Sequence, residues 1–409
     1  MTPARPKAFI PPHGLAALLA SLSAIGPFSI DAYLPSMEEI GLELHVTPIA
    51  VQQTLTAYMV PFALMTLWHG SISDALGRRR VILWGMALFG LASAACAGAT
   101  SIGALLVFRA LQGATAGAGM VVGRAIVRDL YHGAEAQKVM SQVTMSFAIA
   151  PAVAPVIGGW LHVWFGWRAV FVFLVLFTVT CWLLCRRMLP ETLPPARRQP
   201  LHPVYLLRSY WSVLTSLPFV AACLAVTFNF SGFFIYVVSA PVFLMEYLHV
   251  SPTGFLWLFG PLTCGMATGA WLSGRLAERL SPVRTMVWSY VIMGAATGAN
   301  LLYHYLRPPA LPWSVLPLFF VVLGAALCYP SLTLLALDLF PAKRGLAASC
   351  QSFAQTGGAA VNAMIAPLLW FSVRSLAVTQ AVALTLGLAS LVVYLRTAHR
   401  PAVGTATVG

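Results

Sequence analysis

Two ionisable side chains stand inside long apolar runs of this sequence. Asp31 closes the run that begins near Leu15, within AIGPFSIDAYLP (24–35), and Arg109 lies in the run at 102–122. A charge at mid-membrane costs at least a few kcal/mol, so such residues usually face a cavity and carry a function. A carboxyl in a cavity of low dielectric, with an arginine nearby, can load and release a proton as its access changes sides. The pair therefore predicts proton coupling, without catalytic chemistry.

Simpler interpretations of both residues are open from sequence alone. Asp31 lies near the outer end of its run and could reach the hydrated headgroups, and Arg109 could snorkel toward the surface without a partner. Gln112 is one turn from Arg109 and could orient it, or could make an ordinary interhelical hydrogen bond.

The composition indicates an all-α integral membrane protein. Of the 409 residues, 59% are hydrophobic and 9% are charged, and the mean hydropathy is +0.82. A bilayer core of about 30 Å needs about 20 apolar residues per helix, and backbone groups in lipid must be satisfied internally. Twelve transmembrane helices are predicted. They are 14–35, 48–69, 80–98, 102–122, 140–163, 168–187, 214–244, 254–273, 285–305, 313–337, 346–370 and 374–396.

Basic residues set the predicted orientation. Most of the 24 Lys and Arg residues fall in segments that lie inside if both termini are cytoplasmic, whereas Arg168, Arg307 and Arg374 fall in outer loops. The net charge of +13 therefore reflects membrane orientation and gives no reason to expect nucleic acid. We expect a multi-pass protein of a bacterial inner membrane, with lipid as its surroundings and no stable oligomer.

A proline-rich gap divides the chain into two similar parts. We expect a six-helix bundle at 1–187, a cytoplasmic linker at 188–213, a second six-helix bundle at 214–396 and a disordered cytoplasmic tail at 397–409. Gly70 and Asp74 follow the second span, and Gly274 and Glu278 follow the eighth with the same spacing. Two related halves around a central cavity are typical of transporters.

Several other classes of function are disfavoured by missing motifs. The seven cysteines form no CxxC pair, so no metal site is expected. GxxxxGK[ST] is absent, which argues against ATP as the energy source, and HExxH and GxSxG are absent, which argues against an enzyme. No cofactor is expected, and a proton gradient remains as the driving force.

Five motifs resemble those of the major facilitator superfamily, over essentially the whole chain. GSISDALGRRRV (70–81) resembles the loop signature between spans 2 and 3, and RALQGATAG, from Arg109, resembles the span 4 motif of proton-driven members. APAVAPVIGGW (150–160) resembles the span 5 antiporter motif, and GWR (166–168) and PET (190–192) also fit. SIDAYLPSM with RAIVRDL looks closest to the Bcr/CflA family of bicyclomycin- and chloramphenicol-resistance drug:proton antiporters.

The chain departs from the family pattern in places. Ala75 stands where a basic residue is common, and Ala150 and Ala154 stand where glycine is usual. Some relatives carry a second acid two turns before the span 1 aspartate, where this chain has Ser23, so more weight falls on Asp31.

The resemblance implies roles for further residues. It implies two bundles with pseudo-two-fold symmetry, the MFS fold, and a cytoplasmic latch in which Asp74 could also meet the N-terminus of span 11 near Gly345. It implies that the span 5 motif packs tightly against span 8, whose small face carries Gly265 and Gly269. The latch residues are Gly70, Asp74, Gly77, Arg78 and Asp129. The span 5 packing residues are Pro151, Pro155, Gly158 and Gly159.

A substrate cavity is expected between the halves, apolar with a few polar groups. Its candidates are Tyr33, Tyr58, Phe62, Gln112, Met145, Asn229, Tyr236, Tyr329, Gln351, Gln355 and Asn362. The resemblance implies a proton-coupled exporter of small amphipathic drugs, such as phenicol-type antibiotics, that works by alternating access. An exporter of an endogenous metabolite or amino acid, or a proton symporter on the same fold, is the alternative.

Overall fold

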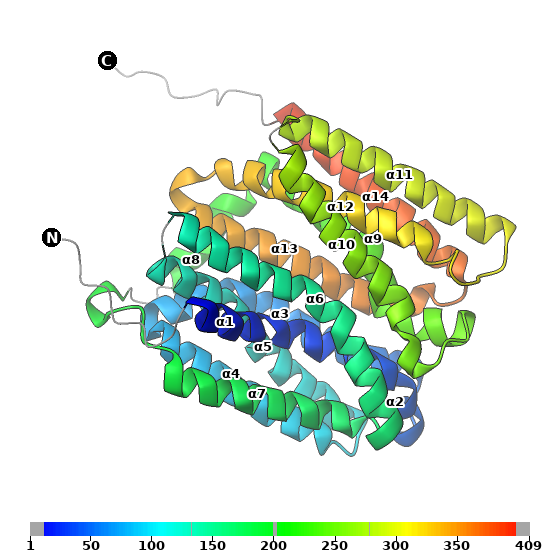
Figure 1. Cartoon of the computed structure of the whole chain (residues 1–409), viewed down its shortest axis with the longest axis horizontal. Coiled ribbons are helices and arrows are strands. Elements are labelled where there is room, and N and C mark those ends of the chain that lie inside the picture. The colour runs from blue at the N-terminus through cyan, green and yellow to red at the C-terminus, as the bar shows by residue number, and fades with distance from the viewer. Residues whose placement is uncertain (1–11, 132, 199–202, 278, 398–409) are drawn as a thin grey trace.

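The computed structural model describes residues 12–131, 133–198, 203–277 and 279–397, and every regular element in those ranges is helical. Long helices run side by side along the molecule (Figure 1). The start of α1 and the end of α14 lie at the same end of the bundle. Following the predicted orientation, we call that end inner. The opposite end, with the loops at 44–47, 98–101 and 165–167, is the outer end.

The first group of helices corresponds to the first six predicted spans. The long ones are α1 (Pro12–Asp31), α3 (Pro48–Leu76), α4 (Arg78–Ala97), α5 (Ile102–Leu130), α6 (Gly133–Phe165) and α7 (Arg168–Met188). A short 3-10 turn, η1 (Leu34–Ser36), and the short helix α2 (Met37–Glu43) follow α1 at the outer end. These helices pack mainly against one another, with α5 in contact with α1, α3 and α4.

The second group repeats this plan after the linker. It contains α9 (Leu217–Val238), α10 (Leu256–Leu276), α11 (Pro282–Leu306), α12 (Leu316–Asp338), α13 (Arg344–Ile365) and α14 (Val373–Thr397). The groups meet where α3 packs on α13 and where α6 packs on α10 and on the 3-10 turn η4 (Pro252–Gly254). Twelve long helices in two packed groups are the predicted architecture.

Local sequence explains where several helices begin and end. The side chains of Thr47, Ser101 and Ser281 accept hydrogen bonds from the backbone N–H groups three residues ahead, at the N-termini of α3, α5 and α11. Pro48 and Pro282 occupy first-turn positions, where the missing N–H has no partner to lose. Helix α3 ends at Gly77, whose φ of 100° favours glycine.

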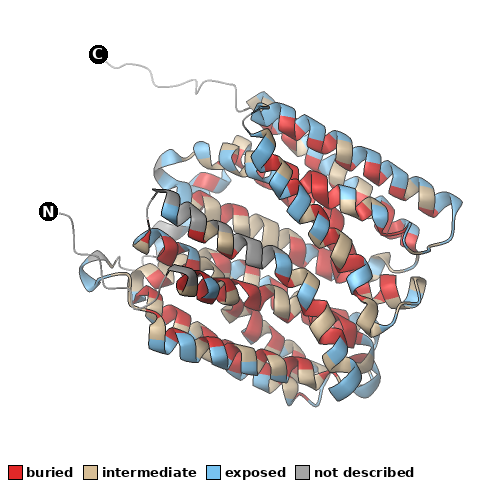
Figure 2. Ribbon diagram, in the orientation of Figure 1, coloured by how far each residue is buried: buried red, intermediate tan, exposed pale blue. Residues whose placement is uncertain are grey.

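Burial follows the pattern expected for a membrane bundle. Among the described helices, 8 spans are long and apolar enough to cross a membrane by length and composition. Buried residues line the surfaces where helices face one another, and exposed residues cover the outer surface (Figure 2). Many exposed side chains are large and apolar, including Trp84, Leu176 and Trp288. In a bilayer those side chains face lipid.

The predicted span at 214–244 is interrupted by proline-associated breaks. Helix α8 (Pro203–Leu214) ends at Leu214, α9 starts at Leu217 with Pro218 in its first turn, and α9 ends at Val238. Pro241 then precedes a π-helical segment, η3 (Val242–Tyr247). The linker thus carries a short helix of 12 residues that was not predicted. Residues 199–202 of the linker, Glu278 of the repeat and 398–409 of the tail lie outside the described residues.

Candidate proton-coupling site

Arg109 lies at the centre of the first helix group and is fully buried. Its guanidinium carbon stands 4.7 Å from the ring centroid of Tyr33, 4.5 Å from that of Tyr58 and 5.9 Å from that of Phe171. These rings come from the segment after α1, from α3 and from α7. Aromatic faces attract a cation electrostatically, and more strongly when both are desolvated. Arg109 therefore does not snorkel, because the three rings enclose its charge.

Hydrogen bonds fix the orientation of this guanidinium. Arg109 Nη1 donates to Gln112 Oε1 at 2.5 Å and to the carbonyl of Ser29 at 3.2 Å. Gln112 Nε2 in turn donates to Ser93 Oγ on α4 at 2.8 Å. Both interpretations of Gln112 describe this geometry, since its Oε1 accepts from Arg109 and its Nε2 makes an interhelical hydrogen bond to α4. Among the described residues, no hydrogen-bond partner meets the buried Nε and Nη2 atoms of Arg109.

A glycine sets the distance between α3 and α5 beside this cage. A Cβ atom on Gly113 would come within 1.9 Å of the Tyr58 carbonyl oxygen, which means that the two backbones touch there. Small residues permit such close approach between membrane helices. The contact places the Tyr58 ring over Arg109, one turn away. Gly113 lies within the RALQGATAG motif, but this contact was not predicted from it.

Asp31 is the last residue of α1, and only 5% of its surface is exposed. It lies two residues beyond Ser29, whose carbonyl binds Arg109. The carboxylate and the guanidinium nevertheless form no ion pair, since no oxygen of Asp31 is within 4.0 Å of a nitrogen of Arg109. The structure thus brings the two predicted residues into one region and leaves the carboxyl out of a salt bridge.

The predicted latch residues form an ionic cluster at the inner end. Arg78 lies 2.6 Å from Asp74 and 3.2 Å from Asp129, so it joins α3, α4 and α5. Two linker residues complete the cluster. The backbone N–H of Arg78 donates to Glu191 at 2.9 Å, and Thr192 Oγ1 donates to Asp129 at 2.9 Å.

Gly77 is required where the linker crosses this cluster. Its φ is positive, and a Cβ there would stand 2.5 Å from Glu191 Oε2. A Cβ on Gly70, one turn before Asp74, would meet its neighbours only at ordinary contact distances. The suggested contact between Asp74 and the N-terminus of α13 is not formed in this structure. Among the described residues the Asp74 carboxylate pairs with Arg78, and Gly345 is exposed.

The two glycines of the antiporter motif pack against different partners. A Cβ on Gly158 would come within 2.0 Å of the Ala32 carbonyl, directly after Asp31. A Cβ on Gly159 would come within 2.3 Å of the Pro252 carbonyl, in η4 of the second helix group. Adjacent residues thus fix α6 against the segment that bears Asp31 and against the other half. Pro151 and Pro155 lie inside α6, where Pro155 is buried.

The small face of α10 does not pack as expected. A Cβ on Gly265 would come within 2.5 Å of the Phe319 carbonyl oxygen, and a Cβ on Gly269 within 2.3 Å of the Leu323 carbonyl oxygen, both on α12. The expected partner was span 5, now α6. Helix α6 does contact α10, but these two glycines serve the α10–α12 contact. Periodicity identifies a small-residue face and does not say which neighbour covers it.

A second ionic cluster closes the outer end of the first helix group. Glu39 lies 2.9 Å from His162 Nδ1 and accepts the backbone N–H of Trp167 at 2.9 Å. Glu43 accepts the Trp167 indole N–H at 2.5 Å and pairs with Arg168. These hydrogen bonds lower the pKa of Glu43, with the Arg168 bond the larger cause. The cluster holds α2, α6 and α7 together.

The cavity candidates of the first helix group mostly belong to the cage. Tyr33 is buried and shares a hydrogen bond with Thr54 at 2.8 Å, and Phe62 stacks on Tyr58 with centroids 5.9 Å apart. Phe62 is half-buried. The side chain of Met145 lies outside the described residues.

The candidates on α12 and α13 have mixed surroundings. Gln351 Nε2 donates to Thr333 Oγ1 at 2.8 Å, and Asn362 Nδ2 donates to the Ser231 carbonyl at 3.3 Å. Gln355 is half-buried and Tyr329 is exposed.

Asn229 and Tyr236 face away from the first helix group. Tyr236 accepts a hydrogen bond from Asn300 Nδ2 at 2.8 Å, and Asn300 also donates to Gln380 Oε1 at 2.7 Å. Asn229 lies against α14, where a Cβ on Gly387 would come within 2.6 Å of its Oδ1. Tyr236 thus belongs to a neutral polar cluster with Asn300 and Gln380, on α9, α11 and α14. Asn300 on α11 and Gln380 on α14 were not predicted from the sequence, because neutral polar residues are common in spans.

Comparison with known proteins places the chain in a family. The family model described as Major Facilitator Superfamily matches residues 18–363 and 222–407. The chain is 29% identical to Multidrug resistance protein D of Escherichia coli over 86% of this chain and 88% of that protein. It is 33% identical to a chloramphenicol resistance protein of Pseudomonas aeruginosa, over 64% and 62% of the two chains. The uncharacterized MFS-type transporter YdgK of Bacillus subtilis is 38% identical, over 64% of this chain and 65% of that one.

Solved structures share the architecture. A crystal structure of a peptide transporter, POT, superposes with a TM-score of 0.74 at 16% identity and covers 96% of each chain. At that identity the likeness shows the fold alone. The family match covers most of the sequence, and the fold agrees with it. The chain therefore belongs to the major facilitator superfamily of multi-pass membrane transporters for small molecules, and it is related to the drug-resistance antiporters that its motifs resemble.

Proposed function

We propose that this protein is a drug:proton antiporter that exports small amphipathic compounds across a bacterial inner membrane, with both termini in the cytoplasm. The observation that carries the proposal is a buried carboxyl, Asp31, without an ion pair, two residues beyond the Ser29 carbonyl that the buried Arg109 binds. The motifs and the resistance relatives agree with drug export. The superfamily works on ion gradients without a cofactor.

The aromatic cage is what leaves Asp31 free to exchange a proton. A buried guanidinium needs compensation for its lost hydration. Tyr33, Tyr58, Gln112 and the Ser29 carbonyl provide it. If the Asp31 carboxylate supplied it instead, the ion pair would hold Asp31 deprotonated through the cycle. A carboxyl outside any ion pair can gain and lose its proton without first breaking a salt bridge.

The closed outer end fits one stage of alternating access. Gln52 on α3 donates to the Ala363 carbonyl on α13 at 3.3 Å, and Gly159 packs on Pro252, so the halves touch at their outer ends. In this arrangement Asp74 does not meet α13. We infer that the halves rock about the bilayer centre, that the outer contacts open when Asp31 is to be reached from outside, and that Asp74 then approaches α13.

In this scheme the proton and the drug compete for one conformational change. Protonation of Asp31 from outside favours drug release and the return to the inward state. Drug binding from inside favours loss of the proton. Each ligand shifts the equilibrium only as far as its affinity differs between the two states.

The test compares Asp31→Asn with wild type in a bacterial host that lacks its own pumps, over a panel of antibiotics. We expect wild type to raise resistance to at least one compound and Asp31→Asn to abolish that gain at equal expression. Glu38→Gln, an exposed acid on α2, is the matched control and should retain resistance. Uphill, proton-driven export by Asp31→Asn would refute the proposed role of Asp31. A panel with no protected compound would favour export of a metabolite.

A further inference from the structure

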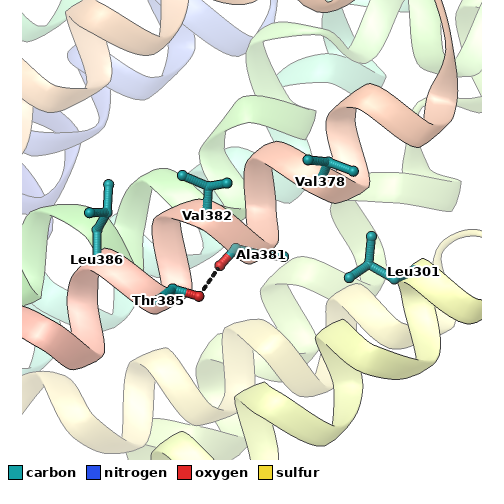
Figure 3. Close-up of a pocket in the computed structure, with 6 residues that line it drawn as sticks. All are labelled: Leu301, Val378, Ala381, Val382, Thr385 and Leu386. Atoms are coloured by element: carbon teal, nitrogen blue, oxygen red, sulfur yellow. Dashed lines mark hydrogen bonds between the residues drawn. The ribbon is translucent and has the colours of Figure 1, made fainter.

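An apolar groove on the lipid-facing side of the second helix group runs between α11 and α14. It has a volume of about 270 Å³ and is lined by Leu301 on α11 and by Val378, Ala381, Val382, Thr385 and Leu386 on α14 (Figure 3). The α14 residues recur at helical spacing, so they form one stripe along that helix. Val378, Val382 and Leu386 are exposed. Because the chain crosses a membrane, this groove opens to lipid.

The two helices that line the groove meet at a cation at its outer end. Arg374 is one turn before Val378 on α14, and Tyr305 is one turn after Leu301 on α11. The Arg374 guanidinium carbon stands 5.4 Å from the Tyr305 ring centroid. Arg374 Nε donates to the His304 carbonyl at 2.9 Å. These contacts orient the guanidinium at the outer end of the groove.

Arg374 has an unusual charge environment for an outer residue. Positive residues are depleted on the outer side of bacterial membrane proteins. Of the three predicted outer arginines, Arg168 is neutralised by Glu43. Arg374 is exposed and has no carboxylate within ion-pair distance among the described residues. Its Nη1 and Nη2 atoms can thus meet an anion in the fork geometry that suits phosphate.

The distance along α14 from Arg374 to the far end of the groove matches one lipid leaflet. From Arg374 to Leu386 the helix rises by about 18 Å, and half of a bilayer core is about 15 Å. A phosphate at Arg374 would therefore place an acyl chain along the stripe down to the bilayer centre. We propose that this groove is a binding site for one anionic phospholipid of the outer leaflet, with its phosphate on Arg374 and an acyl chain between α11 and α14.

The test is native mass spectrometry of the full-length protein in mild detergent, titrated with phosphatidylglycerol. We expect one lipid to be retained by wild type, with retention weaker for phosphatidylethanolamine and absent for glycerol phosphate, which has no acyl chain. Arg374→Gln should weaken phosphatidylglycerol binding about tenfold, the effect of losing one charge-assisted hydrogen-bonded contact. Ala381→Phe, which fills the groove without touching Arg374, should weaken it as well.

Arg307→Gln is the matched control, because Arg307 is an outer arginine beyond the end of α11. It should retain the lipid. Equal retention by wild type and Arg374→Gln would overturn the proposal, as would equal losses in Arg307→Gln and Arg374→Gln. Binding of glycerol phosphate as tight as that of the lipid would show that the groove takes no part, and would overturn it too. The outcome does not depend on which compound is transported.

Discussion

The two halves of this transporter bury polar groups in contrasting ways. In the first half, the cluster around Arg109 contains a full positive charge, held by aromatic rings and hydrogen bonds, and Asp31 is buried two residues beyond the Ser29 carbonyl that Arg109 binds. In the second half, the cluster of Tyr236, Asn300 and Gln380 is equally buried but neutral. Among the residues that the structure describes, this fold therefore buries charged side chains in the first half only.

The difference indicates which half does ion chemistry. Neutral interhelical hydrogen bonds contribute about 0.6 kcal/mol each in membrane proteins and serve packing. A buried charge costs several times more, so its presence needs a function. The first half therefore carries the proton coupling in our proposal, and the second half serves as a rigid partner against which it moves.

The largest effect should come from removing the buried charge. Arg109→Gln keeps an amide in the cage but removes the buried charge and its contact with the Ser29 carbonyl, two residues before Asp31. We expect proton-driven efflux to fall about 100-fold, near the upper end of coupling energies between two sites. Efflux in vesicles with an imposed pH gradient measures this. Arg168→Gln, an arginine of the outer cluster, should change efflux far less, and an equal loss in both would show that the buried charge has no special role.

The next largest effect should come from a glycine that holds backbones together. Gly113→Ala places a Cβ 1.9 Å from the Tyr58 carbonyl, and a backbone atom cannot move aside without shifting α3. Overpacking of this kind costs about 3 kcal/mol. Gly387→Ala, in the second half, meets the Asn229 side chain at 2.6 Å, which can rotate, so about 1 kcal/mol is expected. Thermal unfolding in detergent compares them, and the reverse order would contradict this explanation.

How much of this could be predicted from sequence depended on the kind of signal. Hydropathy located the twelve long helices, and charges in apolar runs located Asp31 and Arg109. Contacts set by tertiary packing were not visible. Phe171 is one of 23 phenylalanines and carries no mark of its place beside Arg109. Likewise, nothing in the spacing of Gly265 and Gly269 says that α12 covers them.

The inner cluster shows the same limit. Asp74, Arg78 and Asp129 follow from a motif, and the structure joins them. Glu191 lies more than a hundred residues further along the chain, and its contact with the Arg78 backbone depends on the path of the linker. Glu191 belongs to the PET motif (190–192), but the motif did not predict a role for it.

A smaller effect should follow from breaking the neutral cluster. Asn300→Leu removes the donor to both Tyr236 and Gln380 and leaves their polar atoms buried without it. We expect a loss of about 1–2 kcal/mol in stability with proton coupling intact. Thermal unfolding and efflux measured on the same preparation separate the two. Loss of coupling without loss of stability would place ion chemistry in the second half.

The smallest effect is a pH dependence at the outer cluster. Hydrogen bonds from Arg168 and Trp167 lower the pKa of Glu43 below its ordinary value of 4.5. Glu43 therefore contributes stability that is present above its unfolded-state pKa and is lost as pH falls through its lowered folded-state pKa. With 43% of its side chain exposed, we expect under about 1 kcal/mol. The stability gap between wild type and Glu43→Gln should thus shrink below about pH 4.5, whereas the gap for Asn300→Leu, which involves no titrating group, should stay constant. A gap for Glu43→Gln that does not change with pH would show that the outer cluster, like the neutral one, acts through packing alone.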